Sequence, residues 1–184
     1  MELTDWELVQ KCQAGEMDAF QELVCRYHQK IYMVILGLLH HREDALEVAQ
    51  ETFFRAYRKI NGFQGGSSFY TWLYRIAVNI AIDAQRRQSR SPLDFRESLD
   101  GLTDAQTEAA NDPFADVHDR ELRENLVKAI NELTPEHKAV IVLRTMEGLS
   151  YKDIGEILGC SEGTVMSRLH YARKKLLEKL SGFL

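Results

Sequence analysis

The chain has 184 residues, 45% of them hydrophobic, which suffices for one ordinary domain or two small ones with real cores. Residues 31–39 form an apolar run, but this run is too short to cross a membrane and has basic side chains beside it. The N-terminus lacks the basic region and apolar core of an export signal, so we expect a cytoplasmic protein.

The net charge of −5 is unevenly distributed along the chain. Residues 1–60 carry 7 basic and 10 acidic side chains, and residues 61–92 carry 4 basic and 1 acidic side chain. Residues 93–124 carry 3 basic and 10 acidic side chains, and residues 125–184 carry 9 basic and 7 acidic ones. Two positive segments therefore flank a strongly negative one, and the local field near a phosphate matters more than the total charge.

The three cysteines, Cys12, Cys25 and Cys160, have no paired spacing. They fit buried or free thiols in a reducing cytosol better than a disulfide framework or a zinc site. We expect no metal and no cofactor.

Apolar positions recur at helical spacing nearly throughout, and no alternating strand pattern stands out, so we expect an all-α fold. Thr4 and Glu7 form a capping box that begins the first helix. Breaks at residues 14–16 and 40–42 bound a second helix.

The next helix is expected from Asp44 to about Ile60. Its inward stripe is predicted to consist of Leu46, Ala49, Phe53 and Tyr57. The residues predicted to face outward are Asp44, Glu47, Gln50, Glu51, Phe54 and Arg58. An exposed phenylalanine among acids and an amide favours a protein-binding face over a DNA-binding one. Taken alone, however, this helix is explained by default as a solvated surface.

A glycine-rich loop follows at residues 61–68, and a helix is expected from Phe69 to about Arg87. Aromatic residues gather in the loop and in the first turns of this helix, close to basic and amide groups. This chemistry suits the stacking of unpaired bases. Core packing explains Trp72 and Tyr74 at least as well, whereas we expect Phe63, on the loop, to be a base contact or a pocket wall.

From residue 88 to about 119 the helical pattern fails, and the composition indicates a flexible acidic linker. Helicity resumes near Arg120, and Thr134 followed by Pro135 begins a further helix.

The most informative stretch is residues 149–176, which predicts a helix-turn-helix. Ser150 and Asp153 begin its first helix as a capping box, Gly159 suits the turn, and Ser161 caps the second helix. The inner stripe of the second helix is Val165, Leu169, Ala172 and Leu176. Its outer faces carry Ser167, Arg168, His170, Tyr171, Arg173, Lys174 and Lys175. Such a helix fits the major groove of DNA.

Three segments together resemble the bacterial extracytoplasmic-function sigma factors, especially the sigma-E-like group: residues 50–57, 68–79 and 148–158. The resemblance implies a transcription initiation factor with no enzymatic activity, with a region 2 domain at residues 1–88, a linker at 89–119 and a region 4 domain at 120–184. The implied partners are the β′ clamp helices and the β flap of RNA polymerase core, promoter DNA and an anti-sigma factor.

The resemblance also implies three sets of binding residues. Polymerase core would be bound by Asp44, Glu47, Gln50, Glu51, Phe54, Arg55 and Arg58. The −10 promoter element would be read by Lys59, Asn61, Phe63, Ser67, Ser68, Trp72, Arg75 and Asn79, with one unstacked base in a pocket near Lys59, Phe63 and Asn79. The −35 element would be read by Ser161, Thr164, Met166, Ser167, Arg168, His170, Tyr171, Arg173 and Lys174.

The chain departs from the sigma-E-like pattern at four positions. Met166 and Tyr171 stand where that group often has arginine, which predicts a different −35 sequence. Gln64 and Gly66 replace charged loop residues, which leaves the −10 preference open.

Two other classes of function make different demands on the sequence. A stand-alone helix-turn-helix regulator would explain residues 149–176 but needs neither the aromatic loop nor the acidic linker. A nucleic-acid enzyme would need converging carboxylates or metal ligands. Asp44, Glu47 and Glu51 share one helix face, but no second set converges with them in the sequence pattern.

Overall fold

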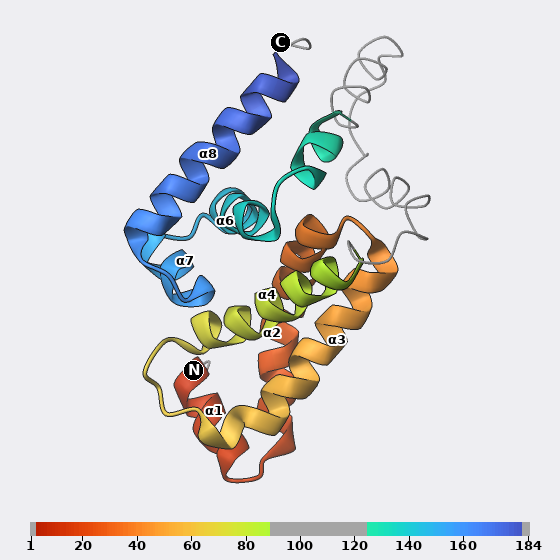
Figure 1. Cartoon of the computed structure of the whole chain (residues 1–184). Helices are drawn as coiled ribbons and strands as arrows, with labels where there is room; N and C mark the ends of the chain where they lie inside the picture. Colours follow the sequence, from red (N-terminus) through yellow and green to blue (C-terminus); the bar gives the residue numbers. More distant parts are fainter. Residues whose placement is uncertain (1–2, 89–124, 182–184) are drawn as a thin grey trace, which may run out of the picture.

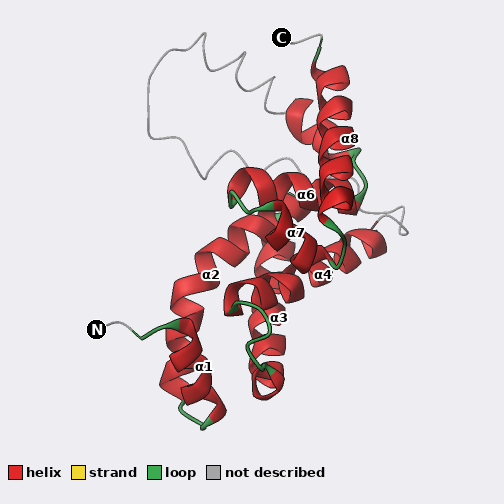
Figure 2. Ribbon diagram, turned by 90° about the vertical axis from the view of Figure 1, so that its left-hand side faces the viewer, coloured by secondary structure: helices red, strands yellow, loops and turns green. Residues whose placement is uncertain are grey.

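The computed structural model describes residues 3–88 and 125–181, and these two stretches contain helices and no strand, as the sequence predicts (Figures 1 and 2). The helices of the first stretch are α1 (Asp5–Gln13), α2 (Met17–Leu39), α3 (Arg42–Lys59) and α4 (Phe69–Gln88), with a short 3-10 helix η1 (Ile60–Gly62) after α3. The second stretch holds α6 (Pro135–Met146), α7 (Tyr151–Leu158) and α8 (Glu162–Leu180), and residues 125–131 are also helical.

Local capping fixes where the N-terminal helices begin and end. The amide of Glu7 donates to Thr4 Oγ1 (3.3 Å) and the amide of Thr4 donates to Glu7 Oε2 (2.7 Å), so the predicted capping box is present. Helix α2 ends at Leu39, and its C-cap residue His40 has a left-handed backbone (φ 55°). Helix α3 begins two residues earlier than expected because His41 caps it, accepting from the amide of Asp44 (3.4 Å).

The predicted inward stripe of α3 is wrong in part. Leu46 and Tyr57 are 45% and 42% exposed, while Ala49 and Phe53 are buried as expected. The buried face is instead composed largely of small side chains: Ala45, Val48, Ala49, Thr52, Phe53 and Ala56. A narrow face of this kind lets α3 lie close to its neighbours and leaves the larger Leu46 and Tyr57 at its margin.

The helix-turn-helix forms as predicted. Ser150 and Ser161 cap α7 and α8, accepting from the amides of Asp153 (3.1 Å) and Thr164 (3.2 Å). Gly159 takes the left-handed conformation (φ 65°) that ends α7. At Gly155, a Cβ atom would lie 2.7 Å from the carbonyl oxygen of Cys160, so the turn folds back onto α7 only because this position is glycine.

The C-terminal helices lie directly on the N-terminal ones, with α6 against α2 and α7 against α4 (Figure 1). At Gly37 of α2, a Cβ atom would lie 2.7 Å from Met146 Sδ, so the close approach of α6 depends on this glycine. Tyr74 Oη donates to Glu147 Oε2 (2.9 Å), and Arg86 pairs with Glu136 (2.6 Å).

The side chain of Lys138, on α6, is buried at this interface. Its ammonium donates to the carbonyl oxygen of Leu38 (3.2 Å) and to Asn131 Oδ1 (2.8 Å). The Leu38 carbonyl is at the C-terminal end of α2, where the helix dipole favours a cation and where α2 itself has no basic residue. Burial lowers the pKa of Lys138 to about 8.

Candidate nucleic-acid interface

The outer face of α3 joins an apolar patch to charged groups. Phe54 is 56% exposed, and the Arg58 guanidinium lies over its ring (5.6 Å to the centroid). Arg55 pairs with Glu51 (2.6 Å) on the same face, and Glu47 and Gln50 are exposed beside them. Asp44 is half-buried at the start of the helix. With Leu46 and Tyr57 added, this face is more apolar than the sequence pattern predicts, and it suits a protein partner.

The aromatic loop is folded around Phe63. This side chain is only 6% exposed, with its ring centroid 5.1 Å from that of Trp72 and 6.1 Å from those of Trp6 and Phe69. Of the two roles expected for Phe63, its burial favours the pocket wall over direct base contact. Tyr74 is fully buried, so for this residue the core explanation holds.

The other loop residues of the predicted −10 set divide into bound and exposed groups. Ser68 Oγ accepts from the amide of Thr71 (3.0 Å), so its hydroxyl serves the start of α4. Ser67 Oγ donates weakly to the carbonyl of Ser68 (3.3 Å). Lys59 and Asn61 are exposed at the end of α3 and in η1.

Arg75 and Asn79 lie on the face of α4 that meets the helix-turn-helix. Arg75 Nε donates to the carbonyl oxygen of Glu156 in α7 (3.0 Å). Both residues line a cavity of about 640 Å³ whose other wall includes Ser161 and Glu162, at the start of α8. This cavity does not include Phe63 or Lys59, and the pocket expected near Lys59, Phe63 and Asn79 stays a prediction.

Helix α8 presents most of the predicted −35 residues to solvent. Val165, Leu169 and Ala172 are buried, as the sequence predicts. The exposed residues are Met166, Ser167, His170, Tyr171, Arg173 and Lys174. The hydroxyls of Ser161 and Thr164 lie 2.9 Å apart in the cap, and Arg168 is half-buried with Nη1 3.8 Å from Cys160 Sγ.

Sequence reasoning missed two residues that shape these surfaces. His137 of α6 packs its ring on Tyr171 (4.7 Å between centroids), and its pKa is lowered by burial and then by the charge of Arg168. Trp6 of α1 lies against the aromatic loop. Neither contact leaves a local signal, because the partners are far apart in the sequence and meet only in the folded chain.

Within residues 3–88 and 125–181, no three His, Cys, Asp or Glu side chains are grouped so that they could hold a metal ion. The three cysteines are free thiols, as expected. None of the described helices is long and apolar enough to span a membrane.

Comparison with known proteins identifies both halves of the chain. The family described as Sigma-70 region 2 matches residues 23–91, and the one described as Sigma-70, region 4 matches residues 123–176. The ECF RNA polymerase sigma-E factor of Haemophilus influenzae is 39% identical over 97% of this chain and 96% of its own length.

Two solved structures share the fold. The structure of CnrH in complex with the cytosolic domain of CnrY matches with a TM-score of 0.69 and 23% identity, covering 97% of each chain. The sigma factor RpoE in complex with the anti-sigma factor NepR, from Bartonella quintana, matches with a TM-score of 0.66 and 24% identity, covering 88% of this chain and 96% of that one.

Proposed function

Because the chain belongs to the sigma-70 family, in its extracytoplasmic-function, sigma-E-like group, we propose that it directs RNA polymerase core to promoters through their −10 and −35 elements. Sigma factors are initiation factors without enzymatic activity. The observation that carries the proposal is the capped helix-turn-helix with a polar, basic outer face, following a region 2 match on the same chain. A stand-alone regulator is not favoured, because it leaves the region 2 match unexplained. We propose that the chain acts in the bacterial cytoplasm, where transcription takes place.

The polymerase-binding surface is proposed to be the outer face of α3. Its exposed Phe54, with Arg58 over the ring, has the aromatic and guanidinium chemistry that dominates many protein interfaces. Glu47, Gln50, Glu51 and Arg55 provide a polar rim. By analogy with the family, the clamp helices of the β′ subunit would bind here, and the C-terminal domain would contact the β flap.

The −35 surface is proposed to be the exposed side of α8. A helix of this kind enters the major groove with its N-terminal half, where Met166, Ser167 and His170 would face base edges. Arg173 and Lys174, farther along, suit phosphate contacts. Met166 and Tyr171 replace two arginines with side chains that cannot bind guanine in a bidentate way, so the preferred −35 sequence would differ from that of sigma-E.

The described arrangement is proposed to be a closed state that must open before initiation. Elements centred about 10 and 35 base pairs upstream lie roughly 25 base pairs apart, which is about 85 Å along B-form DNA. In the structure, Arg75 of the proposed −10 surface instead touches α7 at 3.0 Å. A chain of 36 residues, the number from 89 to 124, can span at most about 130 Å, which is enough for the two surfaces to separate.

We also propose an anti-sigma partner that holds the chain inactive. The solved RpoE structure, which shares this fold, is a complex with the anti-sigma factor NepR. The exposed apolar face of α3 is a surface that such a partner could cover in competition with polymerase. A pull-down from the native cell, with mass spectrometry of bound proteins, would identify it.

The function is tested by transcription in vitro with purified bacterial core polymerase and fragments of the source genome. We expect initiation at discrete sites only when the chain is added, and sequencing of the transcripts would give the −10 and −35 elements. Absence of specific initiation would refute the proposal. A stand-alone regulator would instead bind duplex DNA without polymerase and leave the core inactive at these sites.

A further inference from the structure

The side chain of Tyr171 lies on the outer face of α8 with a second ring behind it. The ring of His137, in the first turn of α6, lies 4.7 Å from the ring of Tyr171 between centroids, with an angle of 38° between the planes. His137 is itself held in place, because its Nδ1 lies 2.6 Å from the hydroxyl oxygen of Thr134, the residue that caps α6. The ring of Tyr171 is therefore supported by another helix rather than free to rotate.

The two helices are also held together beside this stack. Lys175 Nζ donates to the carbonyl oxygen of Glu132 (2.7 Å), and Lys179 pairs with the carboxylate of the same residue (2.8 Å). Glu132 lies three residues before the start of α6. The first turn of α6 is thus joined to α8 on both sides of Tyr171, so His137 stays against this ring when α8 binds a ligand.

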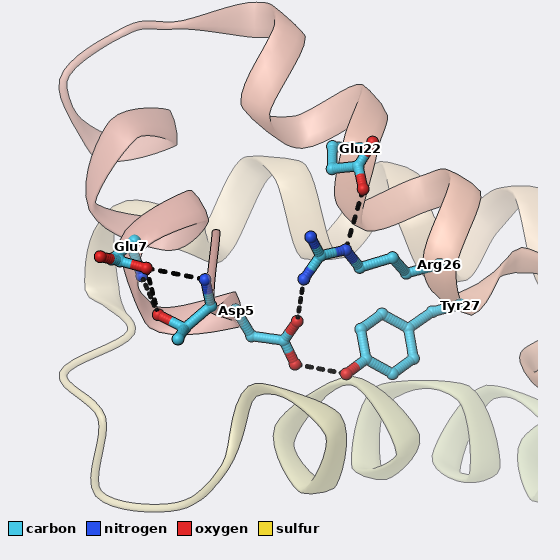
Figure 3. A network of polar contacts seen from close by, with 6 residues as sticks. Asp5, Glu7, Glu22, Arg26 and Tyr27 are labelled. Carbon is cyan, nitrogen blue, oxygen red and sulfur yellow. Dashed lines mark hydrogen bonds and ion pairs between the residues drawn. The ribbon is translucent and has the colours of Figure 1, made fainter. Parts of the chain in front are cut away.

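The hydroxyl of Tyr171 is left for a ligand. Two other tyrosines use this group inside the fold, since Tyr27 donates to Asp5 (Figure 3) and Tyr74 donates to Glu147 (2.9 Å). Tyr171 has no such partner among the described residues, and it is 53% exposed. A phenolic hydroxyl can donate to a phosphate oxygen, and tyrosine is one of the side chains that bind the DNA backbone in this way.

Basic groups surround the stack. Burial, followed by the charge of Arg168 on α8, lowers the pKa of His137. Glu136, beside it on α6, opposes this effect but is paired with Arg86 of α4 (2.6 Å), and Lys175 of α8 adds a second positive charge. A phosphate at this place would be attracted by both α8 cations and would make the protonated imidazole more stable.

We propose that His137 positions Tyr171 to bind a phosphate of the −35 duplex, and that this binding is coupled to protonation of His137. The pair requires α8 to bind promoter DNA, so the inference rests on the proposed function. It adds α6 to the −35 surface, through a histidine outside the set that the resemblance implies. Because the bound phosphate favours the charged imidazole, the complex takes up a proton. Binding should strengthen as the pH falls from about 7.5 to about 5.5, across the ordinary titration range of histidine.

The test uses the full-length chain and a duplex of about 20 base pairs, selected by the wild-type chain from a random pool and labelled for fluorescence anisotropy. The outer face of α8 is exposed in the closed state, so the measurement needs no polymerase. We expect wild type to bind about 3- to 10-fold more tightly at the lower pH, since one proton changes the affinity by at most about tenfold per pH unit. His137→Phe keeps a ring against Tyr171 but takes up no proton. It should bind within about threefold of wild type at pH of about 7.5 and lose this gain.

His170 provides the matched control, because it is an exposed histidine directly before Tyr171 on the same helix. In a chain that already carries His170→Gln, the further change His137→Phe should remove the same gain at low pH. His40 is present in every variant, so its titration cancels in the comparison. At the lower pH, wild type should also show a steeper salt dependence than His137→Phe, by up to about 0.9 in the log–log slope, because one more cation meets a phosphate.

Truncation of the two rings should not be additive. His137→Ala should weaken binding by about 2- to 12-fold at pH of about 7.5, since ordering a side chain on binding costs about 0.5–1.5 kcal/mol. In a chain that already carries Tyr171→Ala, the same change should have little effect. Thermal unfolding checks that each variant is folded. If His137→Ala fails to fold, Tyr171→Phe, on the exposed surface, should still weaken binding about tenfold by removing a hydrogen bond to a charged oxygen.

The outcomes separate this pair from the function on which it rests. An equal gain at low pH in wild type and His137→Phe, additive effects of the two truncations, or no duplex binding by wild type would overturn the proposal. If specific initiation is then still observed, the sigma-factor function stands without the pair. A gain that depends on His137 in a chain that directs no specific initiation would support the pair as a DNA contact and refute the proposed function.

Discussion

Replacing Lys138 by methionine should make the closed state more stable. Lys138 is 4% exposed, and its ammonium is buried where α6 meets the C-terminal end of α2. Methionine keeps much of the length and volume of the stem but brings no charge into the interface. Replacing a buried charge by an apolar side chain of similar volume is often neutral or stabilising.

The size of the effect follows from the pKa of Lys138. A fall from 10.5 to about 8 on burial corresponds to about 3 kcal/mol that opposes closure at neutral pH. The substitution also removes two hydrogen bonds, worth about 1 kcal/mol each. Part of that loss is made good, because the Leu38 carbonyl still accepts from Gln85 and the exposed Asn131 can bond to water. The net gain for the closed state is about 1–2 kcal/mol, or a factor of roughly 5–30.

The assay is the affinity of the full-length chain for polymerase core, measured by fluorescence anisotropy of the labelled protein. If only the open state binds core, the apparent Kd rises in proportion as the open fraction falls. We expect Lys138→Met to bind core about 5- to 30-fold more weakly than wild type. Lys128→Met, which removes an exposed lysine from the neighbouring helical segment, should bind like wild type.

The pH dependence gives an independent check. Because closure lowers the pKa of Lys138, the closed state is weakest relative to the open one below pH 8 and strengthens as the pH rises toward 10.5. Lys138→Met should lose this dependence. Unchanged or tighter core binding by Lys138→Met would show that the buried ammonium does not oppose closure.

Four further outcomes are expected. Gly37→Gln should push α6 away from α2 and tighten the binding of polymerase core. The radius of gyration from X-ray scattering should rise above the roughly 16 Å of a compact chain of this length, and an unchanged radius would argue against the close contact. Lowering the pH from 6.5 toward 4 should shift the wild type to the open state. Burial lowers the pKa of His40 to about 4, so the closed state resists protonation of this side chain. A His40→Leu variant should not open over this pH range. Phe54→Ala should weaken core binding by about tenfold or more, whereas Leu177→Ala, equally exposed on α8, should not. Met166→Arg should shift the −35 preference, read from selected duplexes, toward guanine at the facing base pair, and an unchanged preference would remove Met166 from the reading surface.

The local parts of this fold could be predicted from the sequence because they depend on short-range chemistry. Helices α1, α6, α7 and α8 each begin after a serine or threonine whose hydroxyl accepts a hydrogen bond from the backbone amide three residues later. These capping residues are Thr4, Thr134, Ser150 and Ser161. Gly159 ends α7 for an equally local reason, the low energy of its left-handed backbone. The helix-turn-helix is composed almost entirely of such signals.

The parts that failed depend on contacts between distant segments. Helical periodicity alone does not show that α3 packs through alanines, so it predicts an inward position for the large Leu46 and Tyr57, which are exposed. Nothing in the sequence around Gly37 predicts that α6 packs against this residue. The relation of Phe63 to Asn79 also depends on contacts between distant segments, and the two residues line different cavities.

The chemistry of the interface indicates why closure should be weak. If the chain must open before polymerase and promoter bind, as we propose, the free energy of closure subtracts directly from assembly. Two basic groups buried at this contact, Lys138 and His40, lower that free energy, and neither ring nitrogen of His40 finds a hydrogen-bond partner among the described residues. An apolar pair at these positions would give a chain that closes more firmly. Such a chain should resist unfolding better and initiate less, since each 1.4 kcal/mol added to closure lowers the open population about tenfold.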